Sequence, residues 1–215
     1  FKYQPGKSLL SMLTFTMDPA SPGNTRQRVG YFGKGNGFYL ELSNGVEFVQ
    51  RSNVTGTVVL SNVAQANWNG DTLLGSGASG LTLDITKSQI LWIDMEWLGV
   101  GSVRMGFIIN GIFITAHTFH HANLIKTAYI TTACLPVRYE IQTLNAAAPA
   151  TSNLTQICST VISEGGSTSP LTLYSNLATF SATVGAGTWV PVVSLQLAPG
   201  RLDSVCRSEE RRVGK

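Results

Sequence analysis

The alternation of hydrophobic and polar residues is clearest in the segment Gln89–Leu98. One side of this segment is apolar and the other is mixed: Leu91, Ile93, Met95 and Trp97 against Trp92, Asp94 and Glu96. A period of two residues predicts a β-strand with two different faces. Gly99-Val100-Gly101 follows and predicts a three-residue hairpin loop.

Folding the chain back at this loop predicts which residues of the next strand face the first. The expected pairs are Trp97–Val103, Met95–Met105, Ile93–Phe107, Leu91–Ile109 and Glu96–Arg104. Asn110-Gly111, the strongest two-residue hairpin signal, then predicts a third strand. Its expected pairs are Ile109–Ile112, Phe107–Ile114, Met105–Ala116 and Arg104–His117. A slip of one residue would turn the apolar row outward, so we expect a well-determined register.

The second face of this three-stranded meander is a candidate binding surface. It carries two expected cross-strand rows, Glu96–Arg104–His117 and Trp92–Ile108–Phe113. Small or polar residues lie between the rows and leave a shallow trough: Asp94, Gly106 and Thr115.

Short β-branched runs bounded by turn residues recur along the rest of the chain. They are Ser8–Met17, Gly37–Leu42, Val46–Arg51, Thr55–Leu60, Leu135–Leu144, Leu154–Ser163, Leu171–Val184 and Trp189–Leu197. No helix longer than about three turns is expected. The pattern predicts an all-β fold, an antiparallel β-sandwich of concanavalin-like or jelly-roll type. We expect the main sandwich in residues 1–144 and a linker or seam in 145–153; residues 154–200 either add strands to the same sandwich or begin a second β unit.

The segment Ala64–Gly80 has little periodicity and is expected to be a long surface loop, where binding residues often lie. Trp68 is its candidate ligand-binding residue. The simpler alternative is that Trp68 closes the edge of the sandwich. The glycine-rich run Gly75–Gly80 lacks the lysine and Ser/Thr of a phosphate-binding loop.

Composition adds little to the functional assignment. Charged residues make up only 13% of the chain, so Ser, Thr, Asn and Gln must supply much of the polar surface. Residues 207–215 resemble the translation of a common sequencing adapter and are left out of the fold reasoning; without them, 11 basic residues face 10 acidic ones. No nucleic-acid partner is therefore expected. No apolar run approaches the roughly 18 to 20 residues of a membrane span, and no membrane partner is expected either.

Asp94 and Glu96 invite comparison with β-glucanases, whose active strand resembles Glu-x-Asp-x-Glu. Here Trp92 occupies the position of the first carboxylate, and Glu96 is expected to pair with Arg104. An active or degenerate glycoside hydrolase is therefore only the third hypothesis, and no enzyme activity is expected.

The histidines do not predict a metal site. His117 and His121 would point to one side of an extended strand and His120 to the other, so three ligands cannot converge without a bulge. The widely spaced Cys134, Cys158 and Cys206 are expected to be free thiols, with a Cys134–Cys158 disulfide as the alternative. No cofactor is expected.

Several blocks together resemble a pattern in uncharacterised virion proteins of environmental tailed phages and other large DNA viruses. These blocks are Trp92–Gly106, Asn110-Gly111, His117, Phe119, His121-Ala122-Asn123, Leu135–Ile141, Arg28–Phe32 and Gln156–Gly166. The resemblance implies a non-enzymatic structural or attachment protein of the virion (tail, fibre or capsid-associated). Such a protein would form a homo-oligomer and contact other virion proteins.

The alternative is a carbohydrate-binding, lectin-like module whose partner is a host surface glycan. Trp92 and Phe113 would stack on a sugar ring, and hydroxyl groups would be bound by Asp94, Glu96, Arg104 and His117. Exposure of Trp92 separates the two hypotheses, because only an exposed indole ring can stack on a sugar. Large aromatic residues on both faces of one strand favour burial.

Overall fold

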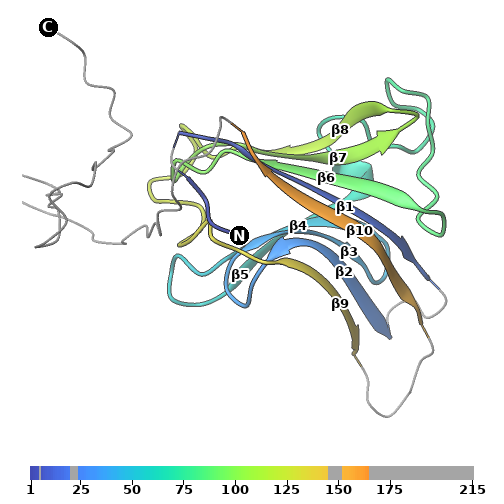
Figure 1. The fold of residues 1–215 in the computed structure, drawn as a ribbon, viewed down its shortest axis with the longest axis horizontal. Coiled ribbons are helices and arrows are strands. Elements are labelled where there is room, and N and C mark those ends of the chain that lie inside the picture. The colour runs from blue at the N-terminus through green and yellow to red at the C-terminus, as the bar shows by residue number, and fades with distance from the viewer. Residues whose placement is uncertain (5, 20–23, 145–151, 165–215) are drawn as a thin grey trace, which may run out of the picture.

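The computed structural model describes residues 1–4, 6–19, 24–144 and 152–164, and these form two five-stranded antiparallel sheets (Figure 1). The first sheet has the order β10 (Leu154–Ser163), β1 (Leu9–Met17), β6 (Gln89–Met95), β7 (Val103–Ile109) and β8 (Ile112–Phe119). The second has the order β5 (Val59–Ala64), β4 (Val46–Ser52), β3 (Gly37–Leu42), β2 (Thr25–Phe32) and β9 (Val137–Thr143). The predicted all-β sandwich is confirmed. The helical element in the described residues is one 3₁₀ turn, η1 (Gln65–Asn67).

The chain crosses between the sheets several times. β2 to β5 form one meander and β6 to β8 another, while β9 returns to the second sheet beside β2. β10 pairs with β1, so residues 154–163 belong to the first sheet. The strands expected in 171–184 and 189–197 lie outside the described residues.

Two strands differ from expectation. β5 begins at Val59 rather than Thr55, because a turn closed by the Gly56 N–H and the Asn53 carbonyl takes up the preceding residues. β2 was not predicted, since polar residues lie on both of its faces. Gln27 and Tyr31 nevertheless point into the sandwich and are buried.

Alternate residues of both sheets meet in one hydrophobic core. Its largest fully buried members include Phe15, Tyr31, Phe38, Phe48 and Phe107. The Tyr31 hydroxyl donates to the Ala133 carbonyl and accepts from the Leu135 N–H, and burial raises its pKa well above the ordinary value. These two hydrogen bonds tie the segment before β9 to the core.

The predicted register of β6 and β7 is wrong by two residues, although the faces are correct. The observed pairs are Leu91–Phe107, Ile93–Met105, Asp94–Arg104 and Met95–Val103. β6 ends at Met95 and the connection is longer than expected: Leu98 and Gly99 both have positive φ, and the Gly101 N–H donates to the Trp97 carbonyl. Trp97 leaves the strand and packs edge-to-face on Tyr3, with ring centroids 5.6 Å apart. Asp94, not Glu96, therefore faces Arg104.

The β7–β8 hairpin follows the prediction as far as Gly106. Asn110 and Gly111 have φ of 55° and 77°, as a type I′ turn requires, and Ile109 pairs with Ile112. A bulge between Met105 and Gly106 then shifts the register, so that His117 pairs with Met105 rather than Arg104. His117 consequently lies on the core face of the sheet.

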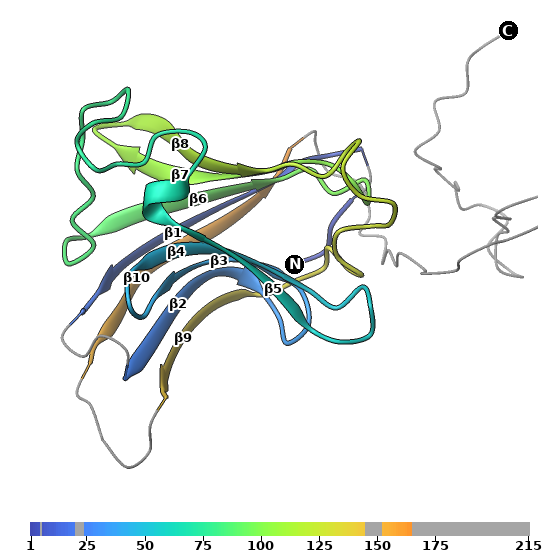
Figure 2. The same ribbon diagram turned by 180° about the vertical axis from the view of Figure 1, so that it is seen from behind.

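The segment between β5 and β6 covers the edge of β8 at this bulge (Figure 2). The Gly70 N–H donates to the Ala116 carbonyl at 2.9 Å, and the Asp71 N–H donates to the Thr115 carbonyl at 3.0 Å. These bonds occupy two acceptors that an edge strand would otherwise leave unpaired.

Candidate functional site

The outer face of the first sheet brings together four of the seven predicted site residues: Trp92, Asp94, Arg104 and Phe113. Because Leu91 and Ile93 point into the core, Trp92 and Asp94 point away from the second sheet. Arg104 donates to Asp94 Oδ2 through Nε at 3.0 Å and also through Nη2. The Arg104 side chain is 54% exposed, whereas that of Asp94 is buried.

The two aromatic rings of this face differ in accessibility. Trp92 and Phe113 are in edge contact, with centroids 5.7 Å apart. Trp92 is only 4% exposed, although it faces away from the second sheet, whereas Phe113 is 51% exposed. Trp92 pairs with Met12 on one side and Gly106 on the other. Phe113, and not Trp92, presents a ring to solvent, so the exposed indole ring that sugar stacking on Trp92 would require is not found.

An open cavity of about 380 Å³ adjoins this surface at the end of β7. Two outer-face residues, Ile90 and Ile108, line it with apolar side chains. Its lining also includes polar residues: Asp84, Lys87, Gln89 and Asn110. Phe113 does not line the cavity itself, but it is the cross-strand partner of Ile108, which does.

A hydrogen-bonded turn fixes the polar wall of this cavity. Asp84 Oδ1 accepts from the Thr86 N–H and hydroxyl, which together hold the pKa of Asp84 below its ordinary value. Lys87 Nζ lies 3.3 Å from Asp84 Oδ2, and Gln89 Nε2 donates to the Asp84 carbonyl. The sequence analysis did not identify these residues. The Asp84-x-Thr86 spacing, typical of an Asx turn, was the available signal.

Three predicted site residues lie elsewhere. Glu96 follows the end of β6 and is not the partner of Arg104; its backbone carbonyl accepts from the Tyr129 hydroxyl. His117 is buried against Phe119 and its Nδ1 accepts from the Asn69 N–H, so it does not extend the Arg104 row.

Trp68 is the third of these, and it lies in the core. Its ring stacks on Phe48 at 4.4 Å between centroids, and its Nε1 donates to the Val63 carbonyl. This agrees with the simpler of the two alternatives for the long loop, in which Trp68 closes the sandwich. Trp68 is therefore not part of the outer-face site.

Asp71 orders the rest of that loop. Its carboxylate accepts from the N–H groups of Leu73 at 2.8 Å and Ser79 at 2.6 Å. Burial by itself would raise the pKa of Asp71, but these bonds outweigh burial and lower it. A Cβ at Gly77 would overlap the Asp71 carboxylate, so any larger residue at this position must displace that side chain.

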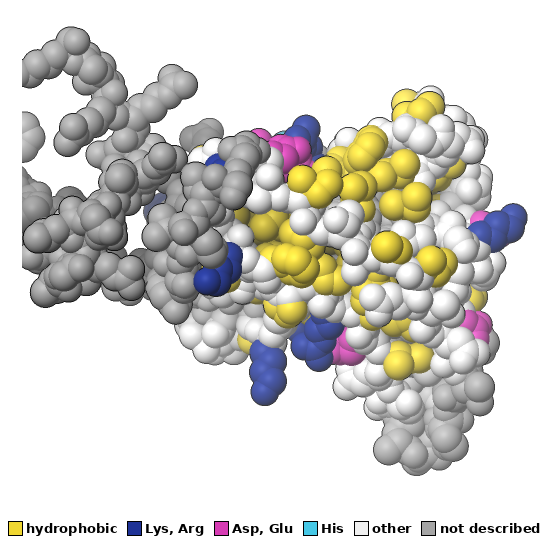
Figure 3. Space-filling view, viewed as in Figure 1, with side chains coloured by type: hydrophobic (Ala, Val, Ile, Leu, Met, Phe, Trp, Pro, Cys, Tyr) yellow, Lys and Arg dark blue, Asp and Glu magenta, His cyan; other side chains and the backbone are white. Residues whose placement is uncertain are grey.

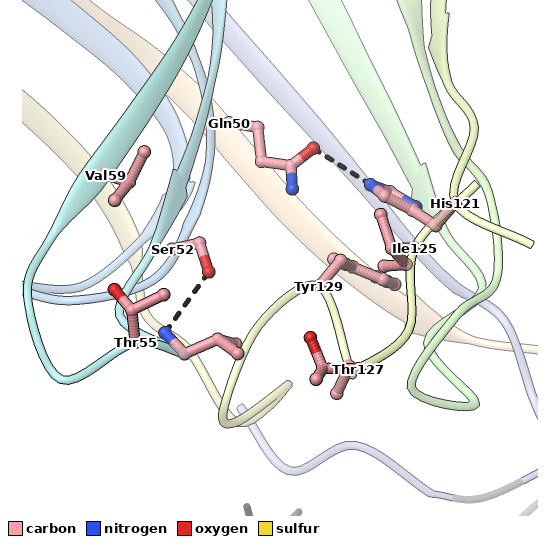
Figure 4. A pocket seen from close by; sticks show the side chains of 10 residues that line it. Gln50, Ser52, Thr55, Val59, His121, Ile125, Thr127 and Tyr129 are labelled. Atoms are coloured by element: carbon pink, nitrogen blue, oxygen red, sulfur yellow. Dashed lines mark hydrogen bonds between the residues drawn. The ribbon is translucent and has the colours of Figure 1, made fainter.

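A second, smaller pocket of about 220 Å³ opens between β4, the start of β5 and the segment after β8 (Figure 4). His121 stacks on Tyr129 with ring centroids 3.9 Å apart. Its Nδ1 lies 2.6 Å from the Gly101 carbonyl and its Nε2 lies 2.9 Å from the Gln50 side-chain amide. Burial lowers the pKa of His121. Much of the remaining lining is aliphatic, from Val54, Val59 and Ile125 among others.

The described residues show neither a metal-binding cluster nor a membrane-spanning helix. They contain no group of three His, Cys, Asp or Glu side chains that could hold a metal ion. Their one helical turn is far too short to cross a bilayer, and no candidate spanning helix is found there. Cys134 and Cys158 are free thiols, and Cys158 is exposed.

Comparison with known proteins does not assign a family. No family model matches the chain, and no curated protein matches it. The expected virion family is therefore not confirmed.

Solved structures with detectable similarity include binding domains of botulinum neurotoxins. The serotype D/C domain is 12% identical with a TM-score of 0.35, and the match covers 69% of this chain and 30% of that chain. The serotype C1 domain is 11% identical with a TM-score of 0.35, and the match covers 69% of this chain and 31% of that chain. The binding domain of neurotoxin DC in complex with SialylT is 13% identical with a TM-score of 0.31, and the match covers 58% of this chain and 26% of that chain. The chain thus spans about a third or less of these structures, and likeness at this level carries no conclusion about function.

Proposed function

We propose that this protein is a non-enzymatic, lectin-like module that binds a carbohydrate on the outer face of the first sheet. The observation that carries the proposal is the exposed ring of Phe113 on the outer face of the sheet, paired with Ile108, which lines an open cavity that also contains polar groups. An aromatic ring packs against the C–H face of a sugar, and surrounding polar groups hydrogen-bond its hydroxyls.

The polar groups have complementary roles. Lys87, Gln89 and Asn110 border the cavity with donors, while the Asp84 carboxylate offers an acceptor. Arg104 lies on the same face and keeps free N–H groups beyond those it donates to Asp94.

The non-enzymatic part of the proposal is supported by the arrangement of the carboxylates. A glycosidase needs two carboxyl groups that face each other across the scissile bond. Asp94 is paired with Arg104, and Glu96 lies beyond the end of β6. Asp84, the carboxylate in the cavity, contacts Lys87, and the described residues of this surface contain no facing pair of carboxyl groups.

A glycan array followed by calorimetry tests the proposal. Wild type should bind a defined glycan, and Phe113→Ala should weaken that binding about tenfold or more, equivalent to about 1.4 kcal/mol. Leu124→Ala is the matched control, because Leu124 is an exposed apolar residue outside this site. An array without signal for wild type, or equal affinities for wild type and Phe113→Ala, would contradict the proposal.

A second candidate is a self-associating structural protein of a virion. The supporting observation is that hydrophobic side chains gather over the first sheet (Figure 3), with Ile90, Phe113 and Ile162 exposed on its outer face. A second copy packed on this face would shield them from water. Light scattering should then show an oligomer that Phe113→Ala weakens, and a monomer at all concentrations would argue against this candidate.

A further inference from the structure

The outer face of the second sheet carries a layer of arginine side chains over two aromatic rings. Phe32, Tyr39 and Val49 form a small buried cluster there, separate from the main core. The ring centroids of Phe32 and Tyr39 are 4.6 Å apart. Arg51 lies over both rings, at 5.4 Å from the Phe32 centroid and 5.0 Å from the Tyr39 centroid.

Two glycines make this layer flat. Gly37 lies between Phe32 and Arg51 in the sheet register, and Gly30 lies between Tyr39 and Arg138. A Cβ at Gly30 would lie 2.6 Å from Tyr39 Cβ, and one at Gly37 would overlap Phe32. The missing side chains leave room for the rings and guanidinium groups to lie across the strands.

Arg51 has no carboxylate partner among the described residues. Its Nη1 donates to the Gly33 carbonyl at 3.0 Å and its Nη2 to the Tyr39 hydroxyl at 3.2 Å. Its Nε is buried without an acceptor, and the residue is only 9% exposed. A buried charge without a counter-ion is costly, so an unpaired guanidinium suggests a site for an external anion.

The other arginines of this face are already paired. Arg26 and Arg28 contact Glu41, while Arg28 and Arg138 contact Glu140. Arg138 also lies over the Phe32 ring, at 5.4 Å from its centroid, and its side chain is 39% exposed. Two guanidinium groups therefore each lie 5.4 Å from the centroid of one ring, and of the two only Arg138 has an acidic partner among the described residues.

We infer that the outer face of the second sheet binds an oxyanion, the carboxylate or sulfate group of an acidic ligand, between Arg51 and Arg138 above Phe32. A guanidinium presents parallel N–H groups that match the oxygens of either anion. The site is on the opposite side of the sandwich from the Phe113 surface, so it does not depend on the proposed function.

Nuclear magnetic resonance of the arginine Nε–H groups tests the inference. Sodium sulfate and sodium glucuronate are titrated separately into the full-length protein at an ionic strength kept constant with chloride. Glucose, which carries no charge, is the control ligand. The Arg51 Nε–H signal should shift and saturate with one or both anions and stay unchanged with glucose. The anion whose titration saturates the Arg51 signal shows whether the site takes a sulfate or a carboxylate group.

Variants separate a built site from general attraction to cations. Arg51→Lys keeps the charge but loses the two parallel N–H groups of the guanidinium, and should weaken anion binding at least tenfold. Lys126→Gln removes an exposed cation outside both proposed sites and should have no effect. If Arg51 variants do not fold, Arg138→Gln at the more exposed position should weaken binding severalfold. A linear, unsaturated response of the Arg51 signal in wild type, a response of that signal to glucose, or equal weakening by Lys126→Gln would overturn the inference.

Discussion

Individual glycine residues allow loops and strands of this sandwich to approach each other closely. At Gly77 the loop backbone passes directly over the Asp71 carboxylate, which accepts hydrogen bonds from Leu73 and Ser79. The run Gly75–Gly80 can be recognised in the sequence as a turn-rich loop. The need for glycine at Gly77 could not be predicted, because it depends on the position of an acid six residues earlier.

We predict that Gly77→Ala lowers the free energy of unfolding by about 1–3 kcal/mol. The added methyl group must displace the Asp71 carboxylate, and the loss of a hydrogen bond to a charged group costs that much. Urea denaturation measures the change. Gly45→Ala is the control, since a Cβ there meets nothing within 4 Å, and an equal loss at both positions would contradict the explanation.

At the scale of elements, the sequence predicts faces better than registers. Alternation correctly placed Leu91 and Ile93 in the core, and Asn110-Gly111 correctly set the start of the β7–β8 pairing. The two errors arise where tertiary contacts override local pattern. Trp97 packs on Tyr3 instead of continuing β6, and the bulge at Gly106 turns His117 inward.

The corrected register makes a quantitative prediction. In a double-mutant cycle, Asp94→Asn and Arg104→Gln should show a coupling of about 0.5–1 kcal/mol, because the Arg104 end of the ion pair is exposed and screened by solvent. Glu96→Gln combined with Arg104→Gln should show no coupling. Thermal unfolding of the four proteins of each cycle provides the measurement, and coupling to Glu96 instead of Asp94 would restore the register expected from the sequence.

At the scale of the whole molecule, the candidate site combines residues that only the fold brings together. Trp92 and Phe113 could be placed on one surface from the sequence, because both lie on strands with clear alternation. The cavity next to them could not, since Asp84 and Lys87 come from the turn before β6 and Asn110 from the hairpin after β7. Trp92 is buried, as the sequence favoured, so the proposed stacking on a sugar is assigned to the exposed ring of Phe113.

The two buried histidines predict how stability depends on pH. Burial lowers the pKa of both His117 and His121, so both rings stay neutral in the folded protein at pH values where the unfolded chain is already protonated. The unfolded state then binds more protons, and stability must fall as the pH drops below about 6.5.

Melting temperatures measured between pH 7.5 and 5 should therefore decrease for wild type and change less for the double variant His117→Gln/His121→Gln. Below about pH 3.8 both proteins should lose stability in parallel, because Asp71 is then protonated in the unfolded chain while its lowered pKa keeps it ionised in the folded protein. A wild-type profile that is flat from pH 7.5 to 5 would show that the two rings do not control stability.

The hydrogen bonds from Gly70 and Asp71 to β8 also affect how copies of this domain could join by strand addition. They occupy carbonyl groups of Ala116 and Thr115, so a foreign strand cannot align along that border of the first sheet. β5 borders the second sheet with Val59 and Leu60 exposed. Of these two borders, only the one formed by β5 offers a template for cross-chain β-pairing, and linear polymers started there would extend the second sheet rather than the first.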